Sequence, residues 1–283
     1  MRAPCRRLRG RKGFVDEERT PPAPAIDTTV SHSARIWDYW LGGKENYEVD
    51  RRLGDQIEAV LPDIVQQARA DRQFLGRVVR YLAGEAGIRQ FLDIGTGLPT
   101  VDNTHQVAQR VAPQSKIVYV DNDPLVLVHA RALLTSTPEG ATDYLDADMH
   151  DPDAILRGAE ATLDFSEPVA ITMLGVVWHV IDDAEARDII GRLKAPLAPG
   201  SHLAIAHPTI EITGEKMAEA IRQWNEFGKP PGTHRTPRQI EALFAGLDLV
   251  EPGVVSCTRW RPDDTRFGEP PETDQFGGVA RKP

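Results

Sequence analysis

The sequence of 283 residues is poor in cysteine and has no long hydrophobic run. Its two cysteines, Cys5 and Cys257, lie too far apart in the sequence to suggest a disulfide framework or a cysteine-rich metal site. No apolar stretch approaches the roughly 20 residues that a membrane-spanning helix needs. The first residues are basic but lack the apolar stretch of a secretory signal. We therefore expect a soluble cytoplasmic protein without a metal site or a membrane anchor.

Positive charge is also scarce, since 33 Lys and Arg stand against 42 Asp and Glu and leave a net charge of -9. A negatively charged protein repels phosphate backbones at long range, so we do not expect a nucleic-acid partner. Basic residues gather at the start, in MRAPCRRLRGRKG, and are followed by TPPAPAIDTT, whose prolines oppose regular structure. We interpret residues 1–30 as a disordered tail and residues 31–283 as a single domain.

The spacing of apolar residues divides this domain near Gly87. Residues 31–87 have helical spacing and predict an N-terminal helical extension. Residues 88–283 alternate short apolar runs with amphipathic stretches, which is typical of a parallel sheet with helices on both faces. An insertion at 208–235 carries the amphipathic stretch EKMAEAIRQWNEF, which is either a surface helix or a wall of the ligand crevice. The predicted strands are 89–94, 116–121, 143–148, 168–174, 202–207, 253–260 and 276–281, and the predicted helices between them are 100–111, 123–135, 151–160, 183–195 and 236–246.

The segment FLDIGTGLPT joins the first of these strands to a helix. The strand ends at Asp93, and Gly95, Thr96 and Gly97 form a tight turn before Thr100, which we expect to cap the helix. The third glycine of the dinucleotide fingerprint is absent, and a pyrophosphate would face the carboxylate of Asp93. Like charges about 4 Å apart repel by on the order of 4 kcal/mol at an effective dielectric constant near 20. The turn therefore favours S-adenosylmethionine (SAM), which carries an ammonium and a sulfonium, over the nicotinamide cofactor of an oxidoreductase.

Two more acidic residues are predicted at the ends of the next two strands. Asp121, followed by Asn122, is suited to accept hydrogen bonds from ribose hydroxyls. Asp148 is suited to accept from the adenine amine, and Met149 to pack against the ring. Each acid alone has an ordinary explanation as a backbone partner, a helix cap or a loop residue. Together they predict one cofactor site, because parallel strands end at the same edge of a sheet.

The sequence also resembles the bacterial S-adenosyl methyltransferase family, formerly a domain of unknown function, from about Ser33 to its end. This resemblance implies a Rossmann-like class I methyltransferase fold with a seven-stranded, mostly parallel sheet, and a SAM site at the glycine turn and the three acids. Pro99 departs from the general methyltransferase pattern. The resemblance supplies no acceptor. Its marks are ARIWDYWLGGKENYEVDR, RQFLDIGTGLPT, VYVDNDPLVLVHARALL, LFAGLDLVEPG and GGVARKP.

Fewer sequence features support the residues that we predict around the methyl acceptor. Arg35, Tyr39 and Asn46 lie in the first of those segments, and by resemblance we expect them to close over the cofactor. Trp178 is a candidate apolar wall for a substrate, although buried tryptophans more often belong to the core.

His179 follows the fourth predicted strand and His207 ends the fifth, and we take them as candidates for a general base. The ordinary alternative for each is a hydrogen-bonded structural histidine. No Asn-Pro-Pro-Tyr segment follows the fourth strand, which by resemblance argues against methylation of a nucleobase. We expect a methyltransferase with a small-molecule acceptor, and the alternative is a non-catalytic SAM-binding or sensing protein.

Overall fold

A computed structural model describes residues 26–133, 135–266 and 268–283. Most of the predicted tail, residues 1–25, lies outside the described residues, and residues 26–30 contain no helix or strand. The central sheet has the strand order β4-β3-β2-β5-β6-β10-β8, and the short β9 pairs with β10. Its strands are β2 (Gln90–Ile94), β3 (Lys116–Asp121), β4 (Ala141–Asp146), β5 (Ala170–Leu174), β6 (His202–Pro208), β8 (Asp248–Leu249), β9 (Val255–Ser256) and β10 (Gln275–Arg281).

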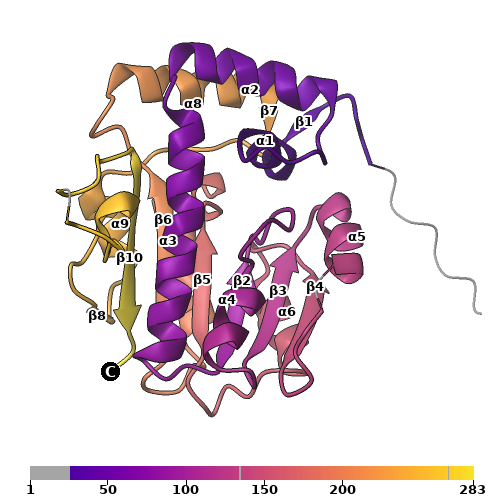
Figure 1. Ribbon diagram of the computed structural model, residues 1–283, viewed down its shortest axis with the longest axis vertical. Coiled ribbons are helices and arrows are strands. Elements are labelled where there is room, and N and C mark those ends of the chain that lie inside the picture. Colours follow the sequence, from indigo (N-terminus) through magenta and orange to yellow (C-terminus); the bar gives the residue numbers. More distant parts are fainter. Residues whose placement is uncertain (1–25, 134, 267) are drawn as a thin grey trace, which may run out of the picture.

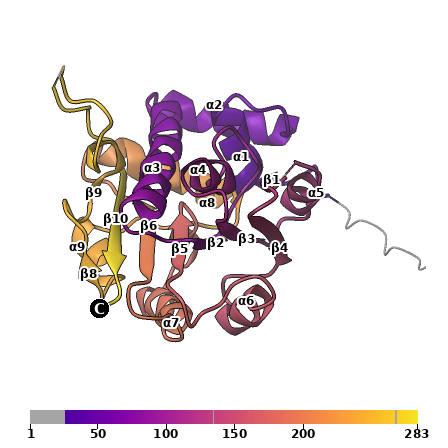
Figure 2. The ribbon, with the colours of Figure 1, turned by 60° about the horizontal axis from the view of Figure 1, so that its bottom comes forward.

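The first five strands of the sheet run parallel, and β10 is antiparallel to β6. This arrangement confirms the predicted mostly parallel sheet. Helices cover both faces of the sheet, as Figure 2 shows, with α6 and α7 on one face and α3 and α4 on the other. The helices of the core are α4 (Thr104–Val111), α5 (Pro124–Leu133), α6 (Pro152–Ala159), α7 (Asp183–Lys194) and α9 (Pro237–Ala242), with short 3-10 turns at η1 (Val177–His179) and η2 (Cys257–Arg259).

Successive side chains along β2 point to opposite faces of the sheet, so a different set of residues packs on each face. Leu92 and Ile94 join the cluster formed with α6 and α7. Phe91 joins the opposite cluster, which includes Phe74 of α3. Asp93 points to the same face as Phe91, so its carboxylate lies on the side of α3 and α4.

The N-terminal extension consists of α1 (Ser33–Trp40), α2 (Glu48–Val60) and α3 (Ile64–Gly84). The predicted helix of the insertion is α8 (Glu215–Phe227), and it packs with α1 and α2 in a third apolar cluster. A two-stranded parallel sheet joins β1 (Ser31–His32) to β7 (Gly228–Lys229). Figure 1 places α1, α2, α8 and this small sheet above the carboxyl ends of the parallel strands.

Three local predictions were wrong. The stretch 253–260 contains the two-residue β9 and then η2, because the chain turns inward to bury Trp260 against Phe74. The outer position of the sheet belongs instead to β8. Helix α4 begins at Thr104, where Asn103 and Gln106 form a capping box, so Thr100 is not the cap. Strand β4 ends at Asp146, paired with Asp121, which leaves Asp148 in the following loop.

Candidate functional site

A cavity of about 230 Å³ lies at the carboxyl ends of β2, β3, β4 and β5. The glycine turn after β2 and the loops after β3 and β4 form its floor. Residues of β1, α1 and α3 also line it. Figure 1 shows β1 and α1 above the ends of the parallel strands and α3 running alongside the sheet. The structure brings all of the predicted cofactor residues to this cavity, namely Asp93, Gly95, Thr96, Gly97, Asp121, Asn122, Asp148 and Met149.

The two glycines of the turn have left-handed backbone angles but different surroundings. Gly95 has a φ of 75°, and a Cβ added there would lie 2.4 Å from the Cβ of Val176. Gly97 has a φ of 66°, and a Cβ there would meet no atom within 4 Å. Gly95 is therefore needed for packing, whereas Gly97 borders open space that a ligand can occupy.

Asp93 is held by two hydroxyl groups within the protein. Thr104 Oγ1 donates to its Oδ2 at 2.6 Å, and Thr172 Oγ1 donates to its Oδ1 at 2.7 Å. Burial raises the pKa of Asp93, and the bonds from the two threonines oppose this shift. The ordinary explanation, in which Asp93 accepts from backbone amides, does not apply, because its two donors are side chains. The carboxylate is fixed in one orientation at the wall of the cavity.

The other two acids have contrasting environments. Asp121 accepts from the backbone N–H groups of Gly97, at 2.8 Å, and Asp123, at 3.0 Å, and burial raises its pKa. Asp148 is exposed and accepts from the backbone N–H of His150 at 2.9 Å. Partial burial acts to raise the pKa of Asp148, but the hydrogen bonds from His150 have the larger combined effect, and the pKa is lowered. Both carboxylates keep lone pairs for a ligand.

Arg72 was not predicted, although it lines the same cavity. It is the one Arg or Lys among the cavity-lining residues of the described chain. Its Nη2 donates to the carbonyl oxygens of Val101 and Asp102, at 3.3 and 3.4 Å, which hold the guanidinium beside the glycine turn. The cavity therefore presents four acids, Asp71, Asp93, Asp121 and Asp148, and one arginine, which matches a ligand with cationic groups, hydroxyls and one carboxylate.

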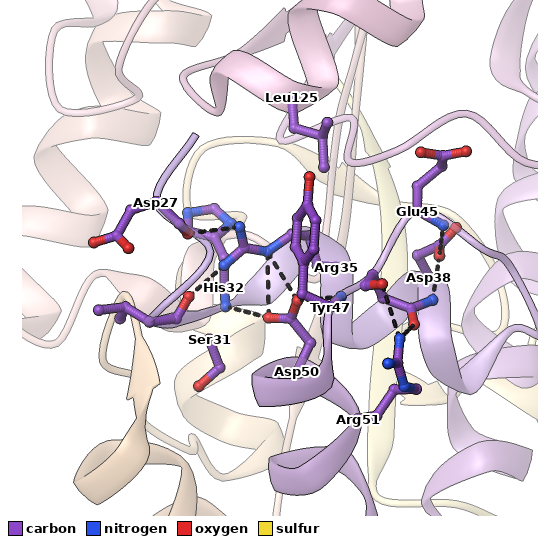
Figure 3. Close-up of polar contacts among 12 residues, drawn as sticks. Asp27, Ser31, His32, Arg35, Asp38, Glu45, Tyr47, Asp50, Arg51 and Leu125 are labelled. Atoms are coloured by element: carbon purple, nitrogen blue, oxygen red, sulfur yellow. Dashed lines mark hydrogen bonds and ion pairs between the residues drawn. The ribbon is translucent and has the colours of Figure 1, made fainter. Parts of the chain in front are cut away.

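The predicted lid residues Arg35, Tyr39 and Asn46 are not among the residues that line the cavity. In Figure 3, Arg35 and Asp50 lie at the centre of a polar network. Arg35 Nε donates to Asp50 Oδ1 at 3.2 Å, and Arg35 Nη1 donates to the carbonyl of Asp27 at 3.0 Å. The same carboxylate accepts from the backbone N–H of His32 at 3.0 Å. Arg35 thus positions the segment that covers the cavity and does not contact a ligand there itself.

Tyr39 and Asn46 have similar supporting contacts. Tyr39 donates to Asp55 at 2.6 Å, and Asn46 Nδ2 donates to Asp38 at 2.8 Å. The segment of β1 and α1 and the turn after it reach the cavity through other residues: His32, Ser33, Ala34, Trp37 and Leu41. His32 also forms an ion-pair contact of 2.8 Å with Asp123 in the loop after β3, which ties the cover to the floor.

The two candidate histidines have different positions. His179 lines the cavity, with Nδ1 2.8 Å from the carbonyl of Pro231 and Nε2 3.2 Å from Ser33 Oγ, and burial lowers its pKa to about 4. His207 does not line the cavity. Its Nε2 lies 2.6 Å from Arg235 Nη1 and its Nδ1 2.9 Å from the carbonyl of Pro208.

The prediction that His207 acts at the crevice needs correction. A guanidinium only donates and a carbonyl only accepts, so Nε2 accepts and Nδ1 donates, which leaves His207 no free nitrogen. Trp178 is also absent from this cavity and lines a neighbouring apolar pocket instead. Within the described ranges, no group of His, Cys, Asp or Glu is arranged to hold a metal ion. No described helix is long and apolar enough to cross a membrane.

Comparisons with known proteins identify the family of this chain. A family model described as S-adenosyl methyltransferase matches residues 19–283. A DUF574 family protein from Streptomyces avermitilis is 45% identical, with a TM-score of 0.88 over 92% of this chain and 100% of that chain. A putative methyltransferase from Thermobifida fusca is 40% identical, with a TM-score of 0.82 over 92% of this chain and 98% of that chain.

More distant structures show the fold alone. The mitomycin 7-O-methyltransferase is 14% identical, with a TM-score of 0.51 over 83% of this chain and 69% of that chain. No curated protein matches the sequence. The fold is that of the Rossmann-like class I methyltransferases, as predicted.

Proposed function

We propose, from the premise that this chain belongs to the S-adenosyl methyltransferase family, that its methyl acceptor is a small molecule. The chain is a SAM-dependent methyltransferase. Membership of this family does not favour the alternative of a non-catalytic sensing protein. It leaves the acceptor open, so the proposal concerns which class of compound receives the methyl group.

The residues of the cavity fit SAM. Asp121 and Asn122 would face the ribose hydroxyls, and Asp148 and Met149 would hold the adenine. Asp93 would face the cationic groups, and Arg72 would pair with the carboxylate. SAM, when bound, supplies an activated methyl group on a sulfonium. The protein contributes position and the exclusion of water, which are the main needs of an in-line methyl transfer.

The cover over the cavity is the observation that supports a small acceptor. His32, Ser33 and Trp37 line the cavity on one side, and Pro230, which follows β7, lines it on another, so that both segments narrow the approach to it. A residue of a folded protein or a base of a nucleic acid would need an open approach to the methyl group. The net charge of -9 also repels polyanions.

Radiolabel transfer tests the class of acceptor. The protein is incubated with a bacterial cell extract and SAM labelled in its methyl group, and the products are separated by ultrafiltration and acid precipitation. Label above that of a heat-inactivated control is expected in the low-molecular-weight fraction. Label confined to precipitated protein or nucleic acid would contradict a small acceptor.

Substitution of Asp93 tests the cofactor site. We expect Asp93→Asn to weaken SAM binding about ten-fold, because one charged interaction with a cationic ligand contributes roughly 1.5 kcal/mol. Isothermal calorimetry measures the affinity, and circular dichroism checks the fold. Asp146→Asn, an exposed acid that ends the neighbouring strand β4, is the matched control. Equal affinities for the two variants would show that the charge of Asp93 does not act on SAM.

A further inference from the structure

A second, smaller pocket of about 50 Å³ lies beside the cofactor cavity. The two share Trp37 and Gly175 as wall residues, so they meet at the end of β5. Four of the five tryptophans of the chain line this second pocket, namely Trp37, Trp40, Trp178 and Trp224. The fifth, Trp260, packs elsewhere, with its ring centroid 5.6 Å from that of Phe74. We call this space the tryptophan pocket.

The order of the strands places the tryptophan pocket at one end of the cofactor cavity. The predicted adenine and ribose residues follow β3 and β4, at one side of the sheet. The tryptophan pocket includes Gly175 after β5, Pro208 at the end of β6 and Gln275 at the start of β10. A cofactor with its nucleoside at β3 and β4 would therefore extend across β2 toward this pocket.

Asp71 lies where the two spaces meet. A Cβ added at Gly175 would be 3.9 Å from both Asp71 Oδ2 and Trp37, and 4.0 Å from Gln275 Nε2. Gln275 Nε2 donates to Asp71 Oδ1 at 3.2 Å, and among the described residues no donor reaches Oδ2. Burial raises the pKa of Asp71 to about 6. One oxygen of a buried carboxylate is thus left for a ligand at the junction.

The walls of the tryptophan pocket favour a flat apolar ligand. The centroid of the Trp178 ring lies 4.9 Å from that of Trp224, and Met217, Ala220 and Ile221 of α8 complete the wall. The indole N–H of Trp178 is buried and has no hydrogen-bond partner within the described part of the chain. Aromatic walls with few polar groups are typical of sites for small aromatic compounds.

We propose that the tryptophan pocket binds the methyl acceptor, a small aromatic compound whose hydroxyl group faces Asp71. This inference rests on the proposed function and names the acceptor's class. In the transfer, the acceptor oxygen forms a bond to the methyl carbon, whose bond to sulfur breaks with the electron pair remaining on sulfur. S-adenosylhomocysteine leaves, and the hydroxyl proton passes to Asp71.

Fluorine NMR of the wild-type chain tests the location of the acceptor. The protein is labelled with 5-fluorotryptophan, and each signal is assigned from a single Trp→Phe variant. Phenol, added in the presence of S-adenosylhomocysteine, should shift the signals of the four pocket tryptophans and leave that of Trp260 unchanged. Shifts of all five signals, or of none, would overturn the proposed site.

A matched pair of variants checks that the shifts arise from the tryptophan pocket. Ala220→Met fills the pocket from α8 and should remove the phenol shifts. Ala218→Met changes the same helix at a half-buried position outside the pocket and should retain them. The radiolabel transfer described above keeps the two proposals apart. Label confined to protein or nucleic acid would refute the proposed function, whereas label in the low-molecular-weight fraction without pocket shifts would refute the acceptor site alone.

Comparison of phenol with anisole, which lacks the hydroxyl proton, tests Asp71. The wild type should prefer phenol about ten-fold, as expected for one hydrogen bond to a charged group. Asp71→Asn should lose this preference, since Gln275 already donates to one side of the group and the new amide can turn only N–H groups toward the ligand. A preference that survives the substitution would show that Asp71 does not face the hydroxyl.

Discussion

At the scale of single residues, the cofactor cavity combines four acids with one arginine. Asp93, Asp121 and Asp148 belong to the sheet edge, whereas Asp71 and Arg72 come from α3 in the N-terminal extension. The guanidinium is held by two backbone carbonyls, and it also interacts electrostatically with Asp71 and Asp93. A bound amino-acid group would then lie between an acid and an arginine, each facing the opposite charge.

Substitution of Arg72 should have an effect that depends on the ligand. We expect Arg72→Gln to weaken S-adenosylhomocysteine binding ten-fold or more, because an arginine–carboxylate pair in a partly buried site contributes on the order of 1.5–3 kcal/mol. Binding of methylthioadenosine, which has no carboxylate, should change little. Calorimetry with both ligands measures the difference. A parallel loss for both would show that Arg72 supports the fold of the cavity and does not pair with the carboxylate.

The sequence allowed some of these residues to be predicted and not others. Asp93 lies one residue before the end of β2 and Asp121 ends β3, so their common location follows from the rule that parallel strands share an edge. The partner of His207 is Arg235, which lies 28 residues away, and no local pattern reports that contact. The sequence did contain a signal for Asp71, because this acid lies on the buried face of α3 in line with Ala68, Leu75 and Val78. A charged residue in such a row is a reason to look for a site.

At the scale of elements, the glycine turn combines a packing role with a binding role. Gly95 fits against Val176 in the loop after β5, and Gly97 borders the cavity. The two positions look alike in the sequence, since both are glycines between a strand and a helix. They differ only in what surrounds them.

Alanine substitutions should separate these roles. Gly95→Ala should destabilise the protein by about 3 kcal/mol or more, because a left-handed backbone angle and a clash with Val176 act together. Gly97→Ala should cost only about 1–2 kcal/mol of backbone strain but should weaken SAM binding, since its methyl group enters the cavity. Urea unfolding and calorimetry measure the two effects. Equal stability losses would contradict the distinction.

Helices and central strands were predictable because their periodicity is long and regular. The stretch 215–227 of the insertion was placed correctly as a helix from its amphipathic pattern. The stretch 253–260 was not, because burial of Trp260 outweighs the strand preference of its valines. The pairing of β1 with β7 links segments that are almost 200 residues apart and involves two residues each, too few for a pattern to form.

At the scale of the whole molecule, buried histidines make the stability depend on pH. Burial lowers the pKa of His179 and His202 to about 4 and that of His207 to about 3. The unfolded chain, with histidine pKa values near 6.5, therefore binds more protons than the folded one below that pH. The free energy of unfolding should fall as the pH decreases from about 6.5 toward 4. Asp71, whose pKa burial raises to about 6, opposes this trend.

Replacing one histidine should reduce this acid sensitivity. We expect His207→Gln, which can still accept from Arg235, to lower the loss of unfolding free energy between about pH 7 and about pH 5 by roughly 2 kcal/mol. Asp71→Asn should increase the same loss, because it removes the group that takes up a proton in the folded state. Urea unfolding at both pH values measures these changes. An unaltered difference in the His207 variant would mean that its protonation is not linked to unfolding.

The small sheet of β1 and β7 connects the cover of the cofactor cavity with α8, which forms a wall of the tryptophan pocket. Ser31 pairs with Gly228, and its hydroxyl donates to the carbonyl of Phe227 at 2.8 Å. The strand on one side leads into the cover of the cofactor cavity, and the strand on the other follows α8, the wall of the tryptophan pocket. Movement of one side would therefore disturb the other, because the two strands pair with each other. Product release and cofactor exchange would then share a single gate, and occupancy of either side would slow departure from the other.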